Sequence, residues 1–595
     1  MSKRPDIQVA RAIAVLAVLG FHIGVPGFFN GFLGVDAFFV ISGFLMGTLY
    51  RDIKSLDYYQ RRFLRLYPSL IVTIVIFVIA GVFFLQPFEL EQLTSQALAG
   101  ILGISNIAYW SQDSYFQPDR FRPLLNLWSL GVEIQFYLIF PFLLYLSKKK
   151  KYILPILTIL SFTFNFLLLQ ISPKTSFFML PSRLWEFLVG MMIVNFQFPN
   201  VGKGKKRLII LLSGFFYTLA LVIPTDSNSS NWLTGHPGLN ALVVVFSIAV
   251  LLKLRISNKW FEFRLGKILE KIGNLSYEIY LIHFPLLTFI NYQAFSGTIT
   301  EVTQIYLAIL IFMAMVALSL IVYKISTFRV FGNPKLVLSA SLGVLIFLST
   351  VPLSNFALAG NSEISRVTSF AISDRSQYRC GKIFRIMHPT SELCLVSSDI
   401  KPERENLLLF GDSRADTLKD EVKKVAGDRA NVYFWVQNSP FQLRTEEILK
   451  IMNKFQIGKV LIHTSSTEPT ADLIQLLNQA KDVEFVMLGS VPTYSMNLPK
   501  LVHQNLATGE LKFSSLDLKS YLVPESLLVD NNYESLRENN FNYISSLDYL
   551  CDVSGCTWHD EENKLYYFDS NHLTLTGARA LRVPISISVD ILLGK

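Results

Sequence analysis

The chain has 595 residues, of which 51% are hydrophobic, 13% aromatic and only 17% charged. Soluble domains carry about 25% charged residues, so this composition excludes a disordered, fibrous or ordinary cytosolic protein and indicates a membrane protein of at least two domains. The net charge of +9 is uneven, with 29 Lys+Arg and 15 Asp+Glu in residues 1–356 but 25 and 30 in residues 357–595. Positive charge beside apolar segments is typical of membrane loops, so we expect no nucleic-acid partner.

Eleven apolar segments of the first 356 residues are predicted membrane spans, since crossing a bilayer takes about 20 mostly apolar residues. They are residues 8–25, 32–50, 69–87, 125–146, 152–170, 180–197, 208–224, 239–254, 275–292, 302–323 and 335–356. The stretch 89–111 is less apolar and carries Glu89, Glu91 and Gln96. We expect it to be interfacial or re-entrant rather than a further span.

The positions of Lys and Arg decide whether residues 89–111 cross the membrane and which side of the membrane the N-terminus occupies. If 89–111 does not cross, Lys148–Lys151 and Lys203–Arg207 fall on the same side as Lys3 and Arg4. The positive-inside rule makes that side the cytoplasm, and an odd number of spans then exports residues 357–595. The first apolar segment lacks a small-residue cleavage site, so we expect an uncleaved signal anchor.

All four cysteines, Cys380, Cys394, Cys551 and Cys556, lie in the C-terminal part. Four cysteines in one globular part predict two disulfides with three possible pairings, and the short spacings favour Cys380–Cys394 and Cys551–Cys556. Disulfides place this part in an oxidising compartment. A zinc site is the competing interpretation, but no pair has the two-residue spacing of a zinc knuckle, so we expect no metal.

The first predicted span contains two ionisable residues, which are costly in a membrane and usually functional. Arg11 and His22 are eleven residues apart, about three helical turns, so they share one face at a separation of about 16 Å. They could line a polar path part-way across the membrane. In the alternative interpretation Arg11 reaches to the membrane surface and His22 is a hydrogen-bonded interior residue.

Other predicted spans also contain ionisable residues. With the orientation above, His22 and four of these residues belong to the outer half of the membrane, where we expect them to converge toward one level. The four are Asp36, Glu133, Arg183 and Glu186, and a ninth predicted span adds Glu278 and His283.

The predicted cytoplasmic loop after the second span contains YYQRRFLRLYP. Arg62 and Arg65 are three residues apart and point the same way if the segment is helical. Two guanidinium groups so placed could bind the phosphates of a cytoplasmic donor. They could equally be ordinary positive-inside residues.

Six segments in order across about residues 4–330 resemble the signature segments of the acyltransferase 3 family of integral-membrane enzymes. They are RPDIQVARAIAVLAVLGFHIGVPGF, GFLGVDAFFVISGFLMG, RRFLRLYP, LWSLGVEIQFYLIFP, PSRLWEFLVG and LSYEIYLIHFPLL. The resemblance implies transfer of an acyl group, most often acetyl, from cytoplasmic acetyl-CoA to an extracytoplasmic glycan. It also implies a location in a bacterial inner membrane.

The resemblance assigns roles to several residues of this chain. Arg11 and His22 match the family's Arg…His pair, which family members need for activity. Arg62 and Arg65 match its Arg-x-x-Arg pair, which is associated with the acyl-donor site. Many members have a Glu-Glu pair in GVEIQFY, of which this chain keeps Glu133 and has Ile134 in the second place.

Two motifs in the C-terminal part predict a nucleophile and its base. The segment 405–418, ENLLLFGDSRADTL, predicts a strand, a Gly-Asp-Ser turn and a helix, which would expose the Ser413 hydroxyl at a helix N-terminus. In the segment 568–581, FDSNHLTLTGARAL, Asp569 lies three residues before His572. Asp569 can therefore orient His572 as a base for Ser413.

Between these motifs the sequence alternates strand and helix patterns: VYFWVQ, TEEILKIMNKF, KVLIHTS, LIQLLNQA and VEFVMLG. This order predicts a three-layer α/β domain with a parallel sheet.

These features resemble the SGNH hydrolase family, which is fused to many acyltransferase 3 proteins. The resemblance implies that Ser413 is the nucleophile, Asp569 the orienting acid and His572 the base. Arg414 stands where such fused domains often have His, and Asn438 is a candidate oxyanion donor outside any Gly-x-Asn-Asp motif. The alternative is a domain that only binds glycan.

The predicted organisation is an acyltransferase 3-type transmembrane domain at 1–356, a linker or extension at 357–404 and an SGNH hydrolase-like domain at 405–595. We expect an O-acetyltransferase of the cell envelope, with acetyl-CoA, the lipid bilayer and a polysaccharide acceptor such as lipopolysaccharide O-antigen as its partners. Two alternatives stay open. The exported domain could be a carbohydrate acetylesterase, or the chain could be a non-enzymatic glycan transporter or binding protein.

Overall fold

The structure is a computed structural model, and its chain divides into two compact units. Residues 1–85 with 89–357 form the N-terminal unit, and residues 86–88 with 358–595 form the C-terminal unit. The structure describes residues 4–594 except 51–54, 112–120, 198–201, 226–228, 257–261, 303, 352–361, 378–379, 382–383, 385–387, 389–390, 437–444, 507–512, 514–515, 535–541 and 554.

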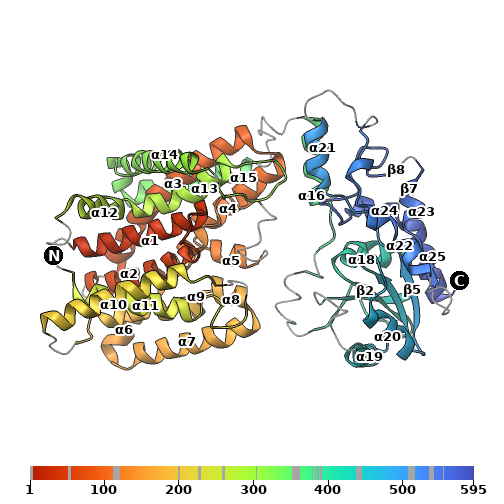
Figure 1. The fold of residues 1–595 in the computed structure, drawn as a ribbon, viewed down its shortest axis with the longest axis horizontal. Helices are drawn as coiled ribbons and strands as arrows, with labels where there is room; N and C mark the ends of the chain where they lie inside the picture. Colours follow the sequence, from red (N-terminus) through yellow and green to blue (C-terminus); the bar gives the residue numbers. More distant parts are fainter. Residues whose placement is uncertain are drawn as a thin grey trace. The chain divides into compact units, whose positions relative to one another are not determined.

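The N-terminal unit is a bundle of α-helices (Figure 1). Its helices are α1 Pro5–Ile23, α2 Gly34–Leu49, α3 Ser55–Phe84, α4 Pro87–Ile101, α5 Ser105–Trp110, α6 Leu127–Lys149, α7 Ile153–Ile171, α8 Pro173–Phe178, α9 Leu180–Ile193, α10 Lys203–Val222, α11 Leu239–Leu254, α12 Arg264–Asn274, α13 Ser276–Ile290, α14 Ile305–Ser326 and α15 Pro334–Thr350. Each of the eleven predicted spans overlaps one of these helices. Within the described chain, six helices are long and apolar enough to cross a membrane, and α11, α13 and α15 are shorter apolar helices.

Helix α3 begins before the third predicted span. The segment with Arg62 and Arg65, predicted to connect the second and third spans, is helical and forms the first turns of this 30-residue helix, which continues through Pro68 into the third apolar segment. The helix is able to continue because its residues before the proline are good helix formers, such as Leu and Arg. The two arginines are therefore on a rigid element.

The segment 89–111 forms two short helices instead of one long one. Helix α4 has 15 residues and α5 has six, and Gly103 lies between them with a φ of +69°, in the left-handed region that favours glycine. Fifteen residues rise only about 22 Å, short of the roughly 30 Å of a bilayer core. A broken helix of this length agrees with an interfacial or re-entrant segment, which stays a prediction.

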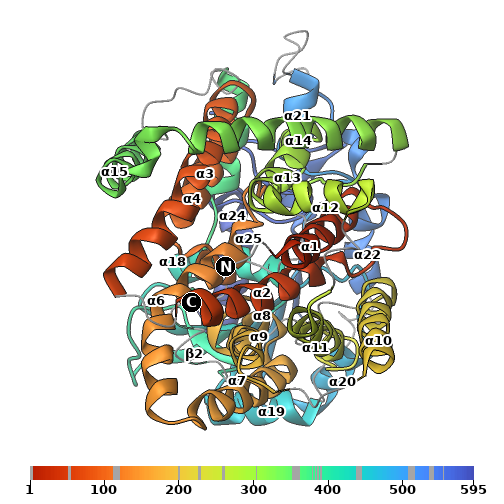
Figure 2. The same ribbon diagram turned by 90° about the vertical axis from the view of Figure 1, so that its left-hand side faces the viewer.

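Helices α1 and α2 lie centrally in the N-terminal unit, with α12 and α13 on one side and α9 and α11 on another (Figure 2). Glycines allow α2 and α9 to touch backbone to backbone. A Cβ added at Gly43 would lie 2.0 Å from the Phe187 carbonyl oxygen, and one at Gly190 would lie 2.2 Å from that of Val40. Close packing of small residues is typical of helices in a membrane, and it brings the polar ends of both helices together.

The C-terminal unit is built on a six-stranded sheet of the described residues, in the order β1-β3-β2-β4-β5-β6. Its strands are β1 Leu393–Leu395, β2 Glu405–Gly411, β3 Ala430–Trp435, β4 Lys459–His463, β5 Glu484–Leu488 and β6 Asn542–Ile544. The pairings from β3 to β6 are parallel, but β1 is antiparallel to β3, with Cys394 opposite Phe434. The prediction of a parallel sheet was wrong at this edge, because the segment predicted as an extension adds a strand.

Helices cover both faces of this sheet (Figure 1). Leu407 and Leu409 of β2 pack into one apolar core, and the alternate residues Leu408 and Phe410 pack into another. Buried residues on both faces of a strand predict a continuous apolar run, as seen in LLLF. The helices are α16 Glu363–Ser373, α18 Ser413–Ala426, α19 Thr445–Lys454, α20 Ala471–Gln479, α21 Leu498–Leu506, α22 Val529–Glu534, α23 Leu547–Leu550, α24 Leu575–Ala580 and α25 Arg582–Leu593.

Both predicted disulfides are present. Cys380 pairs with Cys394, whose Cα atoms are 6.4 Å apart, and Cys551 pairs with Cys556, whose Cα atoms are 3.9 Å apart. The first ties the start of the unit to edge strand β1, and the second closes the small β7–β8 hairpin of Cys551–Asp552 and Gly555–Cys556. The pairing favoured by the short spacings is confirmed.

Candidate active sites

Ser413 is the first residue of helix α18, directly after strand β2. In the sheet, β3 lies on one side of β2, and β4, β5 and β6 lie on the other side. The carboxyl end of β2 is therefore the point where the strand order reverses, and such points form a ligand crevice in open α/β sheets. The topology alone places the serine where a substrate can reach it.

Ser413, His572 and Asp569 form a continuous hydrogen-bonded relay. The Nδ1 atom of His572 lies 2.7 Å from Oδ2 of Asp569, and its Nε2 atom lies 2.7 Å from Oγ of Ser413. A carboxylate only accepts hydrogen bonds, so Nδ1 donates to Asp569 and Nε2 accepts the hydroxyl proton of Ser413. The side chains of His572 and Asp569 are 23% and 32% exposed, so the relay is open to a substrate.

Asp569 is held as an anion by its surroundings. Burial would raise the pKa of this carboxyl group, but hydrogen bonds from the His572 side chain and from the backbone N–H groups of Asn571 and His572 outweigh burial and lower the pKa. The last two bonds also fix the tight turn that presents His572. The turn therefore orients the histidine and keeps its partner charged.

Asp412, the residue before the nucleophile, holds the Gly-Asp-Ser turn in place. One carboxylate oxygen accepts the Arg414 backbone N–H at 2.9 Å, and the other accepts the Ser465 N–H at 2.7 Å. Burial would raise the pKa of Asp412, but the hydrogen bonds from Ser465 and from the Arg414 backbone outweigh burial and lower the pKa. Asp412 therefore caps α18 and ties the turn to the end of β4.

Arg414, which departs from the fused-domain pattern, is buried and makes contacts away from the relay. Its guanidinium donates to the Ser490 hydroxyl and, at 2.8 Å, to the Thr493 hydroxyl, both after strand β5. Burial lowers the pKa of Arg414, opposed by the nearby charge of Asp412. The arginine therefore joins the start of α18 to the neighbouring loop. Asn438 lies outside the described residues.

His463 is a buried residue of this site that the sequence analysis did not identify. It ends strand β4, is fully buried, and donates from Nδ1 to the Leu488 carbonyl at 3.0 Å. Burial lowers its pKa to about 4, so it is neutral at physiological pH. Its place at a strand end beside Gly411 was the available signal, since the carboxyl ends of parallel strands meet at one edge.

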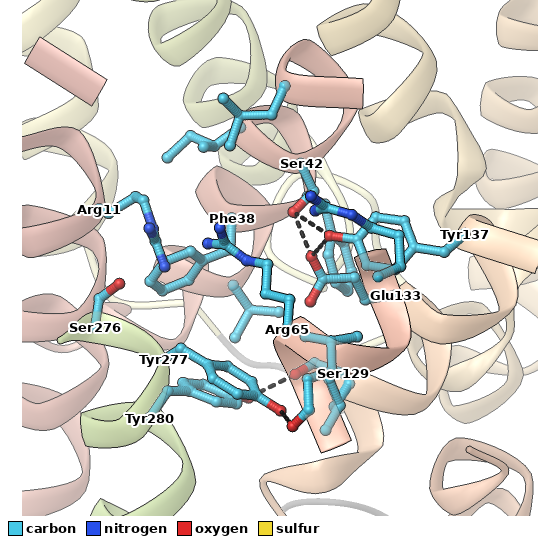
Figure 3. A pocket seen from close by; sticks show the side chains of 17 residues that line it. Arg11, Phe38, Ser42, Arg65, Ser129, Glu133, Tyr137, Ser276, Tyr277 and Tyr280 are labelled. Carbon is cyan, nitrogen blue, oxygen red and sulfur yellow. Dashed lines mark hydrogen bonds between the residues drawn. The ribbon is translucent and has the colours of Figure 1, made fainter. Parts of the chain in front are cut away.

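A cavity in the N-terminal unit, lined by both apolar and charged side chains, brings together four of the predicted site residues, Arg11, Arg62, Arg65 and Glu133. Its volume of about 70 Å³ compares with the roughly 10–15 Å³ that one water needs. Figure 3 shows Arg11 and Arg65 reaching into it from different helices. Three cations and one carboxylate leave a net positive lining, which suits an anionic group.

Glu133 is anchored in this cavity by hydroxyl groups. It accepts hydrogen bonds from Ser42 of α2 and from Tyr137 one turn further along α6 (Figure 3). Arg62 donates to the Tyr50 hydroxyl and lies over the rings of Tyr50 and Tyr137, at 4.7 and 5.7 Å from their centroids. The aromatic rings fix the direction of the guanidinium group.

The expectation that Glu133 converges with the outer-half residues was wrong, because its helix turns it toward the arginines. The outer-half residues instead form their own buried cluster. Arg183 lies 3.1 Å from Asp36 and 3.2 Å from Glu186, and all three side chains are fully buried. His236 joins this cluster 3.7 Å from Asp36. His236 was not among the predicted site residues, because it lies between predicted spans in GHPG.

His22 lines a second, smaller cavity together with His236, Val35 and Tyr280. Its Nδ1 atom donates to the Val18 carbonyl at 2.9 Å, so Nε2 is the basic nitrogen of the neutral ring. The His283 ring lies beside it, with centroids 5.2 Å apart. Val35 and Tyr280 line both cavities, so they separate the arginine cavity from His22.

No group of three or more His, Cys, Asp or Glu side chains suited to a metal ion occurs among the residues that the structure describes.

A helical bundle with a buried polar cavity, joined to an α/β unit with a Ser–His–Asp relay, defines a membrane protein with a second unit of serine-hydrolase type. Comparison with protein families agrees with this class. The family model described as an acyltransferase domain matches residues 4–324, and the model described as an SGNH domain fused to AT3 domains matches residues 379–585. The chain belongs to the acyltransferase 3 family and carries a fused SGNH domain.

Among named relatives, the chain is similar to O-acetyltransferase OatA of Staphylococcus aureus strains NCTC 8325 / PS 47 and COL. Each is 32% identical over 319 residues, covering 50% of this chain and 52% of the relative. The chain spans about half the length of the curated relatives it matches. The solved periplasmic domain of a Salmonella ser. Paratyphi A lipopolysaccharide acetyltransferase covers 39% of this chain and 98% of its own, at 15% identity and a TM-score of 0.29, too low to support an argument.

Proposed function

We propose that this protein is an O-acyltransferase of the cell envelope. It transfers an acetyl group from cytoplasmic acetyl-CoA to hydroxyl groups of an extracytoplasmic polysaccharide such as lipopolysaccharide O-antigen. The observation that carries the proposal is the complete Ser413–His572–Asp569 relay in a chain whose other unit belongs to an acyltransferase family. The N-terminal unit lies in the bacterial inner membrane with its N-terminus in the cytoplasm, and the C-terminal unit lies in the periplasm.

The arginine cavity is the proposed donor site. Arg62 and Arg65 lie on the first turns of α3, and Arg11 lies on α1 across the cavity. Guanidinium groups bind phosphate oxygens through paired hydrogen bonds, and coenzyme A carries three phosphate groups. Glu133 balances part of this positive charge and leaves the cavity selective for an anion. The bilayer and the glycan acceptor are the other partners.

His22 is the proposed acid–base residue of the membrane-embedded step. Its Nε2 atom is basic because Nδ1 donates to a backbone carbonyl, and it faces the small cavity next to the arginine cavity. In that position it accepts the acyl group from the thioester, or removes a proton from the group that accepts it. When the carbon–sulfur bond breaks, the coenzyme A thiolate takes the proton that His22 removed or, if His22 itself carries the acyl group, the Nδ1 proton of the acylated ring, and leaves as the thiol.

Ser413 completes the transfer in two balanced steps. His572 takes the Ser413 proton while Oγ bonds to the acyl carbon, and the bond from that carbon to its carrier breaks as His572 returns the proton to the carrier. A sugar hydroxyl then loses its proton to His572 and bonds to the acyl carbon, which frees Ser413. The Asp569 carboxylate stabilises the imidazolium in both steps.

A second candidate function is supported by the exposure of the relay. The C-terminal unit holds all three groups needed for ester hydrolysis, and they are partly open to solvent. With water in place of the sugar hydroxyl, the same steps make it a carbohydrate acetylesterase. A non-enzymatic glycan transporter is disfavoured, because transport has no use for a formed Ser–His–Asp relay.

The test measures base-labile O-acetyl in envelope polysaccharide by proton NMR. Cells lacking the gene are compared when they make the wild type, His22→Ala or Ser413→Ala. We expect both variants to lose the acetyl signal, because both units serve one pathway. Ile13→Ala is the matched control for α1, since this side chain is 42% exposed, and Ser373→Ala is the control for the C-terminal unit, where it is exposed.

Other outcomes identify the alternatives. Loss in His22→Ala with gain in Ser413→Ala would replace the proposal with an acetylesterase in the C-terminal unit. An unchanged acetyl signal in both well-expressed variants would overturn the enzymatic proposal and favour the transporter.

A further inference from the structure

Three consecutive residues before the SGNH-matched region touch both elements that carry the relay. Asp374, Arg375 and Ser376 follow helix α16 and lie outside both family matches, which end at residue 324 and begin again at residue 379. They are half-buried although they belong to the segment predicted as a linker. Their contacts are specific and differ from residue to residue.

Asp374 holds the chain that follows His572. Its carboxylate accepts the Thr576 backbone N–H at 3.0 Å and the Thr576 hydroxyl at 2.7 Å. Its backbone carbonyl accepts the Leu575 N–H at 2.8 Å. Three hydrogen bonds from one residue therefore fix the start of α24, three residues after the histidine.

Arg375 reaches the other side of the same turn. Its guanidinium carbon lies 5.7 Å from the centroid of the Phe568 ring. The Phe568 ring is stacked on His572, with centroids 5.6 Å apart and an interplanar angle of 13°. A cation over one face of the ring and the imidazole against it limit the rotation of His572.

Ser376 contacts the helix of the nucleophile. Its hydroxyl accepts from Nζ of Lys419 at 2.5 Å, and Lys419 also forms a salt bridge of 2.9 Å with Asp416. Lys419 and Asp416 lie on α18, which begins at Ser413. The three residues thus connect α18 to the turn that presents His572.

We propose that Asp374, Arg375 and Ser376, here called the clasp, are positioning residues that set the distance between Ser413 Oγ and His572 Nε2. The proposal rests on the proposed function, because it assigns the clasp to the same relay. The turn has further support from N–H groups of Tyr494 and Leu498, which donate to the carbonyls of Ser570 and Asp569. Removal of the clasp should therefore weaken catalysis without unfolding the unit.

The test uses the full chain in detergent with p-nitrophenyl acetate as the ester. We expect Asp374→Ala and Arg375→Ala each to lower kcat about 10- to 100-fold with KM nearly unchanged, because small misplacements of a base have effects of that size. Asp374→Asn keeps the oxygen that accepts from Thr576 and should restore most of kcat. Ser373→Ala is the matched control, since its side chain is exposed and, among the described residues, its hydroxyl donates only to the Phe370 carbonyl of its own helix.

Hydrogen–deuterium exchange of the same proteins gives a readout independent of chemistry. We expect Asp374→Ala to raise exchange in peptides covering residues 569–580 and to leave peptides of β4 and β5 unchanged. If Asp374→Ala and Arg375→Ala both kept the wild-type kcat and the wild-type hydrogen–deuterium exchange, the proposed positioning role of the clasp would be overturned. A failure of the proposed function would give a different result. In that case Ser413→Ala would keep wild-type turnover of the ester, while hydrogen–deuterium exchange in the clasp variants would still rise.

Discussion

At the scale of single residues, the relay shows how a few hydrogen bonds select one chemical state of each group. The Nδ1 atom of His572 must donate because Asp569 is a carboxylate, and this leaves Nε2 to take the Ser413 proton. His22 reaches the same tautomer by another route, with a backbone carbonyl in place of the carboxylate. A backbone carbonyl orients the ring but cannot balance a full positive charge as Asp569 can.

Loss of one member of the relay should be as damaging as loss of two. We expect Ser413→Ala and His572→Ala each to lower kcat for p-nitrophenyl acetate at least about 10³-fold in the full chain, because neither group acts without the other. The double variant should be no slower than either single variant. Steady-state kinetics measure this, and a further large loss in the double variant would show that the two side chains act separately.

Asp412 should make stability depend on pH in one direction. Its hydrogen bonds outweigh burial and lower its pKa below the ordinary 3.8. A lowered pKa means that the stabilisation is complete above the ordinary value and is lost as the pH falls through the folded value. We expect the unfolding midpoint of Asp412→Asn to lie below that of the wild type at pH 7, and the gap to shrink below about pH 4.

Thermal unfolding of the C-terminal unit at pH 7, 5 and 3 measures this gap. Asp399→Asn is the control, because Asp399 is exposed. A gap that grows toward acid pH would contradict the assignment.

At the scale of elements, residues 357–404, predicted as a linker or extension, contribute more than a connection. Their described part supplies α16, the clasp and strand β1, and β1 pairs with β3 at the edge of the sheet. The Cys380–Cys394 disulfide fastens β1 to the start of this unit. One edge of the sheet is thereby a strand of only three residues held by a disulfide, and short edge strands limit association with other chains.

The two disulfides should differ in their effect on stability because they close loops of different length. The Cys380–Cys394 bridge has a sequence separation of 14 and the Cys551–Cys556 bridge one of 5. Loop-closure entropy predicts losses of about 3 and about 2 kcal/mol in the free energy of unfolding when each pair is replaced by serine. Denaturant titration of both double variants measures these losses, and a larger loss for the shorter loop would contradict the entropic account.

The small cavity beside His22 should limit the length of the acyl group. Its volume of about 10 Å³ is close to the roughly 10–15 Å³ that one water needs, so a long acyl chain has less room there than acetyl. We expect the wild type to favour acetyl over butyryl donors at least about 10-fold, and Val35→Ala to reduce this preference, because Val35 lines both cavities.

Transfer from radiolabelled acyl donors in membranes measures the preference. Val40→Ala is the matched control, because it makes the same change on the same helix at a buried residue outside the described linings of both cavities. An unchanged preference in Val35→Ala would move the length limit to another site.

At the scale of the whole molecule, charge is divided between a positive apolar unit and a negative polar one. This division is expected of a chain whose first unit is anchored by positive cytoplasmic loops and whose second unit is exported. The predicted topology depends on the broken α4–α5 segment, because one more crossing of the membrane there would move every later loop to the opposite side of the membrane.

Reporter fusions test this topology directly. We expect alkaline phosphatase fused after residue 86 and after residue 115 to be active in both cases, and fused after residue 150 to be inactive, because 89–111 does not cross and Lys148–Lys151 stays in the cytoplasm. A fusion after residue 595 should be active. Opposite activities after residues 86 and 115 would show that the segment spans the membrane.

The sequence by itself determined the elements and the chemistry-bearing residues. Apolar runs located the helices, because a bilayer core fixes their length and composition, and the short cysteine spacings favoured the disulfides that form. Motif spacing identified Ser413, Asp569 and His572 because the relay depends on local turns that the chain encodes over a few residues.

Only the tertiary structure decided which residues are in contact. In the N-terminal unit Glu133 lies with the arginines, and His236 lies with Asp36 and Arg183. In the C-terminal unit His463 lies beside Gly411, next to the nucleophile turn, and β1 pairs with the sheet as an antiparallel edge strand. These contacts join segments far apart in the chain, and they depend on helix rotation and strand order. A periodic pattern shows which face of an element is apolar, but the neighbour of each polar side chain follows from the packing of all elements together.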